Sequence, residues 1–277
     1  MHLLVADSET AEQRRVRRAT VGSTSAESYA ATLETIAPGA RCEIVRPHED
    51  GPGTRPVQAL EAYDAVFLSG SPMHVHEDTP EARRQIAFMR AVFAAGTPSF
   101  GSCAGLQIAV AAAGGVVGEA DRYEAGFARR ICASAAGRSH PLLAGRPASW
   151  DALAIHSDAV VRLPPGATLL AGNAVCPVQA VEIRFDRGLF WGVQYHPELT
   201  LPEIAAALRR QDSGLVEAGF ARGEADIEHQ AVLIDALAAE PARRDLAWRL
   251  GIDDEIIDTA MRQRELRNFV GHLRPSR

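Results

Sequence analysis

Short apolar runs alternate with longer helical patterns through the first 115 residues, and this alternation limits the fold more than any other feature of the sequence. The pattern predicts strands at 2–7, 42–47, 64–70 and 98–101, and helices at 25–38, 79–96 and 105–115. Buried strands that alternate with helices are typical of a parallel sheet covered on both faces. Ligands bind such a sheet at the carboxyl ends of its strands. The glycine-marked turns at 69–72 and 101–105 therefore fall on one edge of the sheet.

The second half of the chain has a different pattern. Short alternating runs at 124–134, 152–156, 178–186 and 189–196 predict an antiparallel or mixed section of sheet, followed by a helix at 201–219. From residue 220 onward there is no strand pattern, and apolar residues in 253–273 lie at roughly helical spacing. We therefore divide the chain into a domain at 1–219 and a helical extension at 220–277, which packs on that domain or on a partner chain.

The composition excludes several classes of function. A formal net charge of −6 gives no overall attraction to nucleic acid or to anionic membranes. No window approaches the roughly 18 apolar residues of a membrane span, and the N-terminus lacks the pattern of a signal peptide. The four cysteines are widely separated, which argues against a disulfide framework or a zinc knuckle. We expect a cytoplasmic protein that binds neither nucleic acid nor membrane.

One cysteine stands where a strand is predicted to become a helix. Cys103 lies in "GSCAGLQ", between Gly101 and Gly105. The start of a helix lowers the pKa of a thiol, because unpaired backbone N–H groups favour the thiolate there. The two glycines permit a tight nucleophile turn of the G-x-S-x-G kind. A small apolar residue in a buried turn is the alternative interpretation of this segment.

A histidine and a carboxylate follow the last predicted strand. His196 and Glu198 lie two residues apart in "QYHPE", so their side chains point the same way in an extended segment. A carboxylate beside an imidazole raises its pKa and fixes its tautomer, as a thiolate–imidazolium pair requires. A histidine that only closes a strand-end turn is the alternative. The backbone N–H groups of Ser71 and Ala104 are candidates for binding an oxyanion.

In combination, "GSP", "GSCAGLQ", "AIHSDAVVRLPPGATLLA" and "VQYHPE" resemble the class I (triad) glutamine amidotransferases, and most of all the stand-alone proteins similar to the glutaminase portion of GMP synthetase. The resemblance covers roughly residues 1–215. It implies an α/β, flavodoxin-like fold with a mixed, mostly parallel sheet between helices. It also implies a catalytic triad of Cys103 as nucleophile, His196 as general base and acid, and Glu198 as the residue that orients the histidine.

The same resemblance implies the substrate-binding residues, which are Gly70, Gln107, His156, Ser157 and Asp158. Ser157 replaces a glycine of the family's His-Gly-Asp stretch, and Gly70-Ser71-Pro72 stands where the family often has Gly-Gly-Pro. Gly105-Leu106-Gln107 stands where the family often has Gly-His-Gln, and neither this change nor Ser71 removes a backbone donor. The natural substrate is therefore open between free glutamine and another γ-glutamyl compound.

Two other segments receive simpler interpretations. His74, His76, Glu77 and Asp78 lie within five residues, but we interpret them as a solvated loop and expect no metal there. The basic stretch 14–25 is interpreted as a loop, with the hypothesis that it covers the site and meets an anionic acceptor or partner. We expect Trp150, Trp191 and Trp248 to be packing residues.

The sequence thus predicts an enzyme that hydrolyses the γ-amide of glutamine through a thioester, without a cofactor, and delivers ammonia to an unidentified acceptor. A fused synthetase does not fit in the roughly 60 residues after the core, since none of them forms a Gly-rich nucleotide loop. Either a separate synthetase subunit therefore accepts the ammonia or the protein acts alone, and a homodimer is also open. Two alternatives remain, a γ-glutamyl hydrolase that acts on γ-glutamyl amines or peptides, and a non-catalytic scaffold of the same fold.

Overall fold

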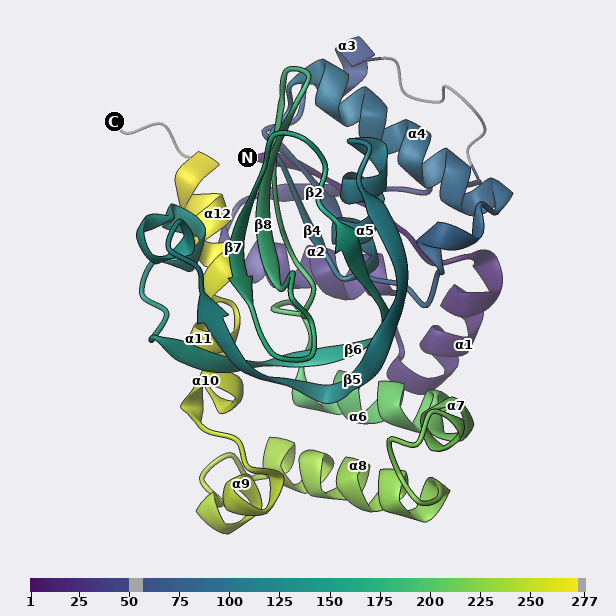
Figure 1. The fold of residues 1–277 in the computed structure, drawn as a ribbon, viewed down its shortest axis with the longest axis vertical. Coiled ribbons are helices and arrows are strands. Elements are labelled where there is room, and N and C mark those ends of the chain that lie inside the picture. Colours follow the sequence, from purple (N-terminus) through teal and green to yellow (C-terminus); the bar gives the residue numbers. More distant parts are fainter. Residues whose placement is uncertain (50–56, 274–277) are drawn as a thin grey trace.

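The computed structural model describes residues 1–49 and 57–273, and its centre is one sheet flanked by helices (Figure 1). The described residues form nine strands in the order β2-β1-β3-β4-β9-β8-β7-β5-β6. Their bounds are β1 His2–Ala6, β2 Arg41–Val45, β3 Ala65–Leu68, β4 Ser99–Ser102, β5 Val116–Ala133, β6 Ser149–Arg162, β7 Ala167–Gly172, β8 Ala180–Phe185 and β9 Gly188–Val193. The pairings from β2 to β9 are parallel and those from β9 to β6 are antiparallel. The predicted mixed sheet of an α/β fold is confirmed.

The parallel half is buried on both faces, as its continuous apolar strands predict. Along β1, Leu3 and Val5 pack in one core cluster while Leu4 and Ala6 pack in the other. This alternation follows from the two-residue period of a strand. Helices α2 (Ser25–Ile36) and α12 (Arg264–Leu273) cover the first face, and α4 (Pro80–Ala95) and α5 (Ala104–Ala112) cover the second (Figure 1). The carboxyl ends of β1, β3, β4 and β9 therefore meet at one edge of the sheet.

The antiparallel half is built from strands longer than the sequence pattern indicates. β5 and β6 pair along most of their length through three register shifts, which let β5 curl around the sheet (Figure 1). The pattern missed β7 altogether and detected only the C-terminal half of β5 and the central part of β6. Alternation of apolar and polar residues does not reveal the full length of these strands, because bulges shift which side chains face the core.

The predicted helix at 201–219 is two helices. Thr200 and Glu203 form a capping box at the start of α6 (Leu201–Arg210), and the chain then turns at Gln211 into α7 (Asp212–Glu217). Helices α8 (Glu224–Ala239) and α9 (Arg244–Leu250) pack below α6 and share a core cluster with β5 and β6 (Figure 1). The division of the chain at residue 219 stays a prediction.

The C-terminal segment 253–273 is also not one helix. It is divided into α10 (Asp254–Ile257), α11 (Thr259–Arg262) and α12, because the side chains of Asp253 and Asp258 cap new helix starts. Glu265 at the start of α12 is fully buried and accepts two hydrogen bonds of 2.7 Å from Arg146. This ion pair ties the end of the chain to the sheet domain.

The basic stretch 14–25 is not a loop. Thr10 and Gln13 form a capping box that starts helix α1 (Ala11–Val21), and Gly22 ends it in a left-handed conformation. Each of the four arginines in this helix pairs with a carboxylate, and Arg17 is buried against Glu203 of α6 at 2.7 Å. The charge of each of these arginines is therefore balanced within the fold.

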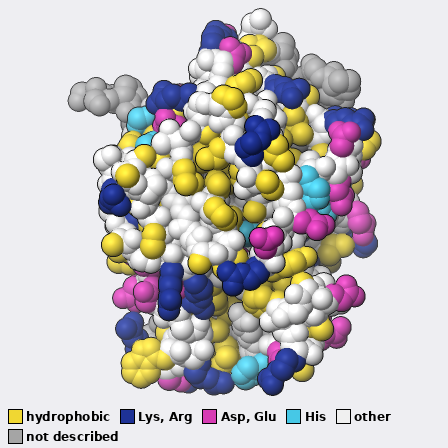
Figure 2. Space-filling view, viewed as in Figure 1, with side chains coloured by type: hydrophobic (Ala, Val, Ile, Leu, Met, Phe, Trp, Pro, Cys, Tyr) yellow, Lys and Arg dark blue, Asp and Glu magenta, His cyan; other side chains and the backbone are white. Residues whose placement is uncertain are grey.

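The surface of the C-terminal helices carries charges of both signs, and basic and acidic side chains are interspersed over α8 and α9 (Figure 2). Trp150 and Trp191 are buried as predicted, but Trp248 on α9 is 75% exposed, so its packing role was predicted wrongly.

No helix in the described ranges is long and apolar enough to cross a membrane. The remaining short helices are α3 (Val57–Leu60) and 3₁₀ turns at Val75–Glu77, Gly137–Ser139 and Pro141–Leu143.

Candidate active site

Cys103 occupies a strained turn between β4 and α5. Its φ of 51° and ψ of −112° are unusual for a residue with a side chain, and such backbone strain occurs preferentially at functional sites. Close packing requires the flanking glycines. A Cβ on Gly105 would lie 2.5 Å from the carbonyl oxygen of Leu68, and one on Gly101 would lie 2.7 Å from the backbone of Gly105. The local sequence therefore folds as the predicted nucleophile turn.

The loop after β9 places an imidazole and a carboxylate beside this turn. His196 Nδ1 lies 2.7 Å from Glu198 Oε1, and both side chains are buried. The imidazole and the cysteine share Gly70 as a neighbour, since a Cβ there would lie 2.6 Å from His196 Cε1 and 3.7 Å from Cys103 Cβ. Nε2 of His196 is buried without a hydrogen-bond partner. It is free to exchange a proton with a thiol or with a bound substrate.

The charges of these groups depend on one another. Burial alone would lower the pKa of His196, but the Glu198 carboxylate and the Cys103 thiolate together raise it to about 10. The imidazole is therefore protonated at neutral pH, so a positive charge lies beside the cysteine. Gln194 on the same loop donates from Nε2 to Cys103 Sγ at 3.6 Å, which further stabilises a negative sulfur. The arrangement can attack a carbonyl carbon and protonate a leaving group.

The two predicted oxyanion donors lie on either side of the cysteine. Ala104 is the first residue of α5, and Ser71 follows β3 and lines the pocket. Among the described residues, neither backbone amide donates a hydrogen bond to another group. Two unpaired N–H groups near a nucleophile have the composition of an oxyanion hole.

These groups open into a pocket of about 530 Å³. Of the predicted site residues, the structure brings Gly70, Ser71, Cys103, Gln107, His156, Ser157, Asp158 and His196 to its wall, with Ala104 and Glu198 buried behind them. The pocket extends past the predicted site to residues of α1, α6 and α7. We call the part near Gln107 and 156–158 the α5 half, and the part near α1, α6 and α7 the α1 half.

The α5 half is held rigid by buried polar contacts. Gln107 donates from Nε2 to the Asp158 carbonyl oxygen at 3.1 Å and to Gln194 Oε1 at 3.3 Å. The His156 ring lies between Glu124 Oε2 at 3.0 Å and the Asp158 carbonyl oxygen at 2.9 Å. The amide nitrogen of Gln107 is thus engaged within the protein.

The α1 half has a mixed wall. Its apolar members are Val16, Leu199, Ala207 and Leu215, and its charged members are Glu9, Glu12, Arg17 and Arg210. Nε of Arg17 is buried without a hydrogen-bond partner, and burial raises the pKa of the Glu9 carboxyl. Sequence reasoning missed this half, since its residues come from helices far apart in the chain.

The contacts of Gln194 and those of His74 and His76 were not predicted from the sequence. Gln194 stands two residues before His196 in "VQYHPE", so its spacing on one face of an extended segment was an available signal. His74 and His76 are exposed, as predicted for a solvated loop, but they also contact Asp158, while Asp78 pairs with Arg83. No local pattern connects residues 74 and 158.

Comparisons with known proteins show what the chain is similar to. Residues 26–211 match the model of the family "Glutamine amidotransferase class-I". The chain is 36% identical to a "Gamma-glutamyl-L-1-hydroxyisopropylamide hydrolase" of a Pseudomonas species, over 99% of this chain and 93% of the relative. It is 33% identical to the GMP synthase [glutamine-hydrolyzing] of Wolinella succinogenes over 61% of this chain, but spans only 30% of that relative.

The fold is also that of solved structures. A glutamine amidotransferase from Thermotoga maritima aligns with a TM-score of 0.64 and 14% identity, covering 98% of this chain and 97% of that one. At this identity the likeness concerns the fold alone. The alignment extends through the C-terminal helices.

Proposed function

Because the chain belongs to the class I glutamine amidotransferase family, whose members are cysteine-dependent amidohydrolases, we propose that it hydrolyses γ-glutamyl amides of small amines. The observation that carries this proposal is the α1 half of the pocket, which gives room for a leaving group larger than ammonia. The match to a γ-glutamyl amide hydrolase along nearly the whole chain supports the same choice.

The proposed chemistry follows from the positions of the side chains. The Cys103 thiolate attacks the γ-carbonyl carbon, and the N–H groups of Ser71 and Ala104 bind the oxygen as it becomes negative. The C–N bond then breaks while His196 transfers its proton to the leaving nitrogen, which leaves a thioester on Cys103. Water attacks the thioester, gives a proton to His196 and releases glutamate and the thiolate. Glu198 keeps the imidazole oriented throughout.

The side on which the amine leaves is set by His196, since this residue must reach the leaving nitrogen. His196 contacts Gly70, whose carbonyl oxygen accepts a hydrogen bond of 3.0 Å from Ser25 Oγ, and the Ser25 amide donates to Glu9 Oε2 at 2.8 Å. These contacts lead from His196 into the α1 half. The glutamyl part therefore occupies the α5 half, and the amine occupies the α1 half.

The side chains of the α1 half indicate which kind of amine fits there. Val16, Ala207 and Leu215 suit a short alkyl group, while the unpaired Nε–H of Arg17 suits a hydroxyl or carbonyl oxygen at its end. A small amine with one polar group meets both requirements. The substrate class is therefore a γ-glutamyl amide of a short amino alcohol or a similar amine.

A panel of γ-glutamyl amides tests the proposal. Release of amine or ammonia is measured for glutamine, γ-glutamylethylamide and γ-glutamyl amides of short amino alcohols, with Cys103→Ala as the inactive control. We expect kcat/KM to be at least about tenfold higher for an amino-alcohol amide than for glutamine, because burying two or more methylenes gives about 1.5 kcal/mol. Equal or higher kcat/KM for glutamine would reject the proposed substrate class.

A variant of the exposed Val16 tests where the amine lies. We expect Val16→Trp to raise the KM for γ-glutamyl amides of bulky amines while leaving that for glutamine within threefold, since the indole fills part of the α1 half. Val161→Trp, at a position that is 65% exposed and outside the pocket, is the matched control. An equal change in KM for glutamine would contradict the assignment of the two halves.

A second candidate is glutamine hydrolysis with delivery of ammonia to a synthetase subunit, which the likeness to GMP synthases favours. Glutaminase activity that rises when cellular partners are added supports it.

A non-catalytic scaffold is the third candidate. It predicts no labelling of Cys103 by a glutamine-like electrophile at any pH. The cytoplasmic location and the homodimer stay predictions.

A further inference from the structure

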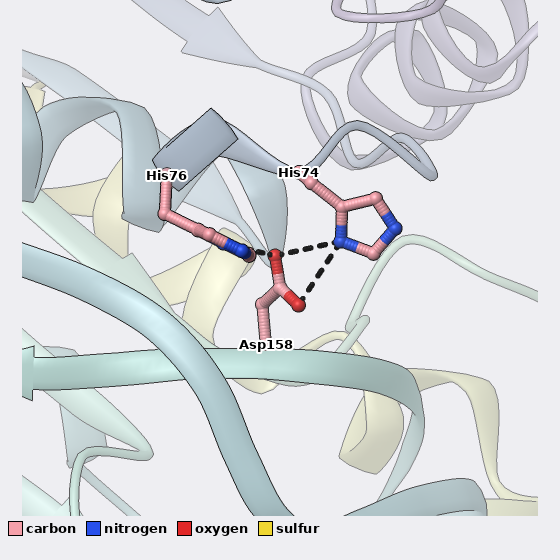
Figure 3. Close-up of side chains that lie close together, drawn as sticks. All are labelled: His74, His76 and Asp158. Atoms are coloured by element: carbon pink, nitrogen blue, oxygen red, sulfur yellow. Dashed lines mark hydrogen bonds and ion pairs between the residues drawn. The ribbon is translucent and has the colours of Figure 1, made fainter. Parts of the chain in front are cut away.

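Two histidines and an aspartate converge at the edge of the α5 half (Figure 3). His74 Nδ1 and His76 Nδ1 lie 3.0 Å and 3.1 Å from the same oxygen, Asp158 Oδ2. The three donor atoms all lie within 4.8 Å of one another. His74 precedes the 3₁₀ turn Val75–Glu77, His76 lies within it, and Asp158 projects from β6 below them (Figure 3).

The charge on Asp158 is not balanced by a permanent cation. Its side chain is only 5% exposed, yet its ion-pair partners among the described residues are the two imidazoles, with no arginine. A buried carboxylate is costly unless a positive charge accompanies it. The imidazoles lie on the solvent side, with side chains 45% and 24% exposed for His74 and His76. A cation from solution can therefore reach the carboxylate.

The donor set and its spacing fit a divalent transition metal. Imidazole nitrogen and carboxylate oxygen are ligands of zinc, cobalt and nickel, whereas calcium and magnesium prefer oxygen alone. Ligands at about 2.0 Å from a tetrahedral zinc lie about 3.3 Å from one another, close to the separations found here. Second contacts hold the carboxylate, since Ser157 Oγ donates to Oδ1 at 3.2 Å and Gln107 holds the Asp158 backbone.

We propose that His74, His76 and Asp158 bind one zinc-like divalent ion, and that this ion inhibits hydrolysis by occupying the glutamyl side of the pocket. The inhibitory part rests on the proposed function, in which Asp158 contacts the glutamyl group of the substrate. His74 also lines the pocket, so an ion between these residues lies at the substrate's entry. The fourth coordination position is left to water.

Metal binding is measured first without any substrate. A Cys103→Ala, Cys132→Ser protein removes the active-site thiol and the exposed cysteine, and is titrated with Co²⁺ by absorption and with Zn²⁺ by calorimetry. We expect one ion per chain, and at least about 100-fold weaker binding in His76→Gln, because loss of even an outer contact costs 10- to 100-fold. His229→Gln, at an exposed histidine of α8, is the matched control. Equal affinity in His76→Gln, or no binding to the starting protein, overturns the site.

Inhibition is measured next on the protein with Cys103 in place. We expect Zn²⁺ to compete with the γ-glutamyl substrate, and His76→Gln to keep its basal kcat/KM while losing at least tenfold in sensitivity to the ion. Unchanged sensitivity in His76→Gln would place the inhibiting zinc on the Cys103 thiolate and overturn the inhibitory part. Binding with no inhibition would overturn that part while leaving the metal site intact. If the panel of γ-glutamyl amides rejects the proposed substrate class, the metal titration still tests the metal site by itself.

Discussion

The replacement Glu198→Gln tests the source of the charge on His196. The pKa of His196 is about 10, compared with 6.5 for an unperturbed imidazole. This difference corresponds to about 5 kcal/mol in favour of the imidazolium, at 1.36 kcal/mol per pKa unit. Burial opposes the charge, and the Glu198 carboxylate and Cys103 thiolate both support it. If they share the effect equally, removal of the Glu198 charge costs the imidazolium about 2.5 kcal/mol, which corresponds to a pKa of His196 lower by roughly 1.8.

The assay is kcat/KM against pH, from pH 6 to 10.5, with the best γ-glutamyl amide of the panel. Activity requires the imidazolium to protonate the leaving nitrogen, so it falls as pH rises through the pKa of His196. We expect this decline near pH 10 in the unmodified protein and at a lower pH in Glu198→Gln, with kcat/KM at pH 7 reduced at least about 50-fold. Stability follows the same sign, because a raised folded-state pKa contributes fully below about pH 6.5 and is lost as pH rises through about 10.

A second carboxylate–imidazole pair gives the control. Glu182 lies 3.0 Å from His140, away from the pocket lining, and also accepts from Trp191. Glu182→Gln removes a similar ion pair without touching the site, so its kcat/KM should stay within threefold and its pH profile should not move. A loss of less than threefold in Glu198→Gln, or an unchanged basic decline in its pH profile, would refute the role given to Glu198.

Two further replacements test the packing of the site and of the chain end. Gly70→Ala places a methyl group 2.6 Å from the His196 ring, so kcat/KM should fall at least about 100-fold while the circular dichroism spectrum is retained. The control Gly271→Ala lies in open space on α12 and should change neither kcat/KM nor the spectrum. A kcat/KM within threefold of the unmodified protein in Gly70→Ala would contradict the geometry. Glu265→Ala leaves Arg146 buried without its main partner, so urea unfolding should show that the free energy of unfolding falls by about 3–5 kcal/mol. A fall below about 1 kcal/mol would mean that α12 packs on the domain without the help of this ion pair.

The parallel half of the fold could be predicted from the sequence because its signals are local. Continuous apolar runs between capped helices locate β1, β3 and β4, and Thr79, Pro80 and Gly96 bound α4 as expected. The nucleophile turn is local as well, since Gly101 and Gly105 flank Cys103 within five residues. His196 and Glu198 are separated by one residue. Each of these features depends on contacts between near neighbours in the chain.

The remaining features depend on contacts that no local pattern records. Register shifts in β5 and β6 obscured their length, and a capping box at Thr10 and Gln13, just before the basic stretch, starts α1 where a loop was expected. The α1 half of the pocket needs α1 to pack against α6, which the buried pair of Arg17 and Glu203 brings about across 186 residues of sequence. The contact of His74 and His76 with Asp158 likewise joins the turn after β3 to the distant strand β6.

This difference between near and distant contacts has a functional consequence. The groups proposed to perform the chemistry lie on short segments after β3, β4 and β9, which the parallel sheet brings together. The proposed amine side is lined by α1, α6 and α7, and α1 is joined to α6 by the pair of Arg17 and Glu203 and by a hydrogen bond from Arg210 to Thr20. Changes in these helices can therefore alter the accepted amine without disturbing the triad. The proposed function thus predicts that specificity for the amine and reactivity toward the amide are separable in this chain.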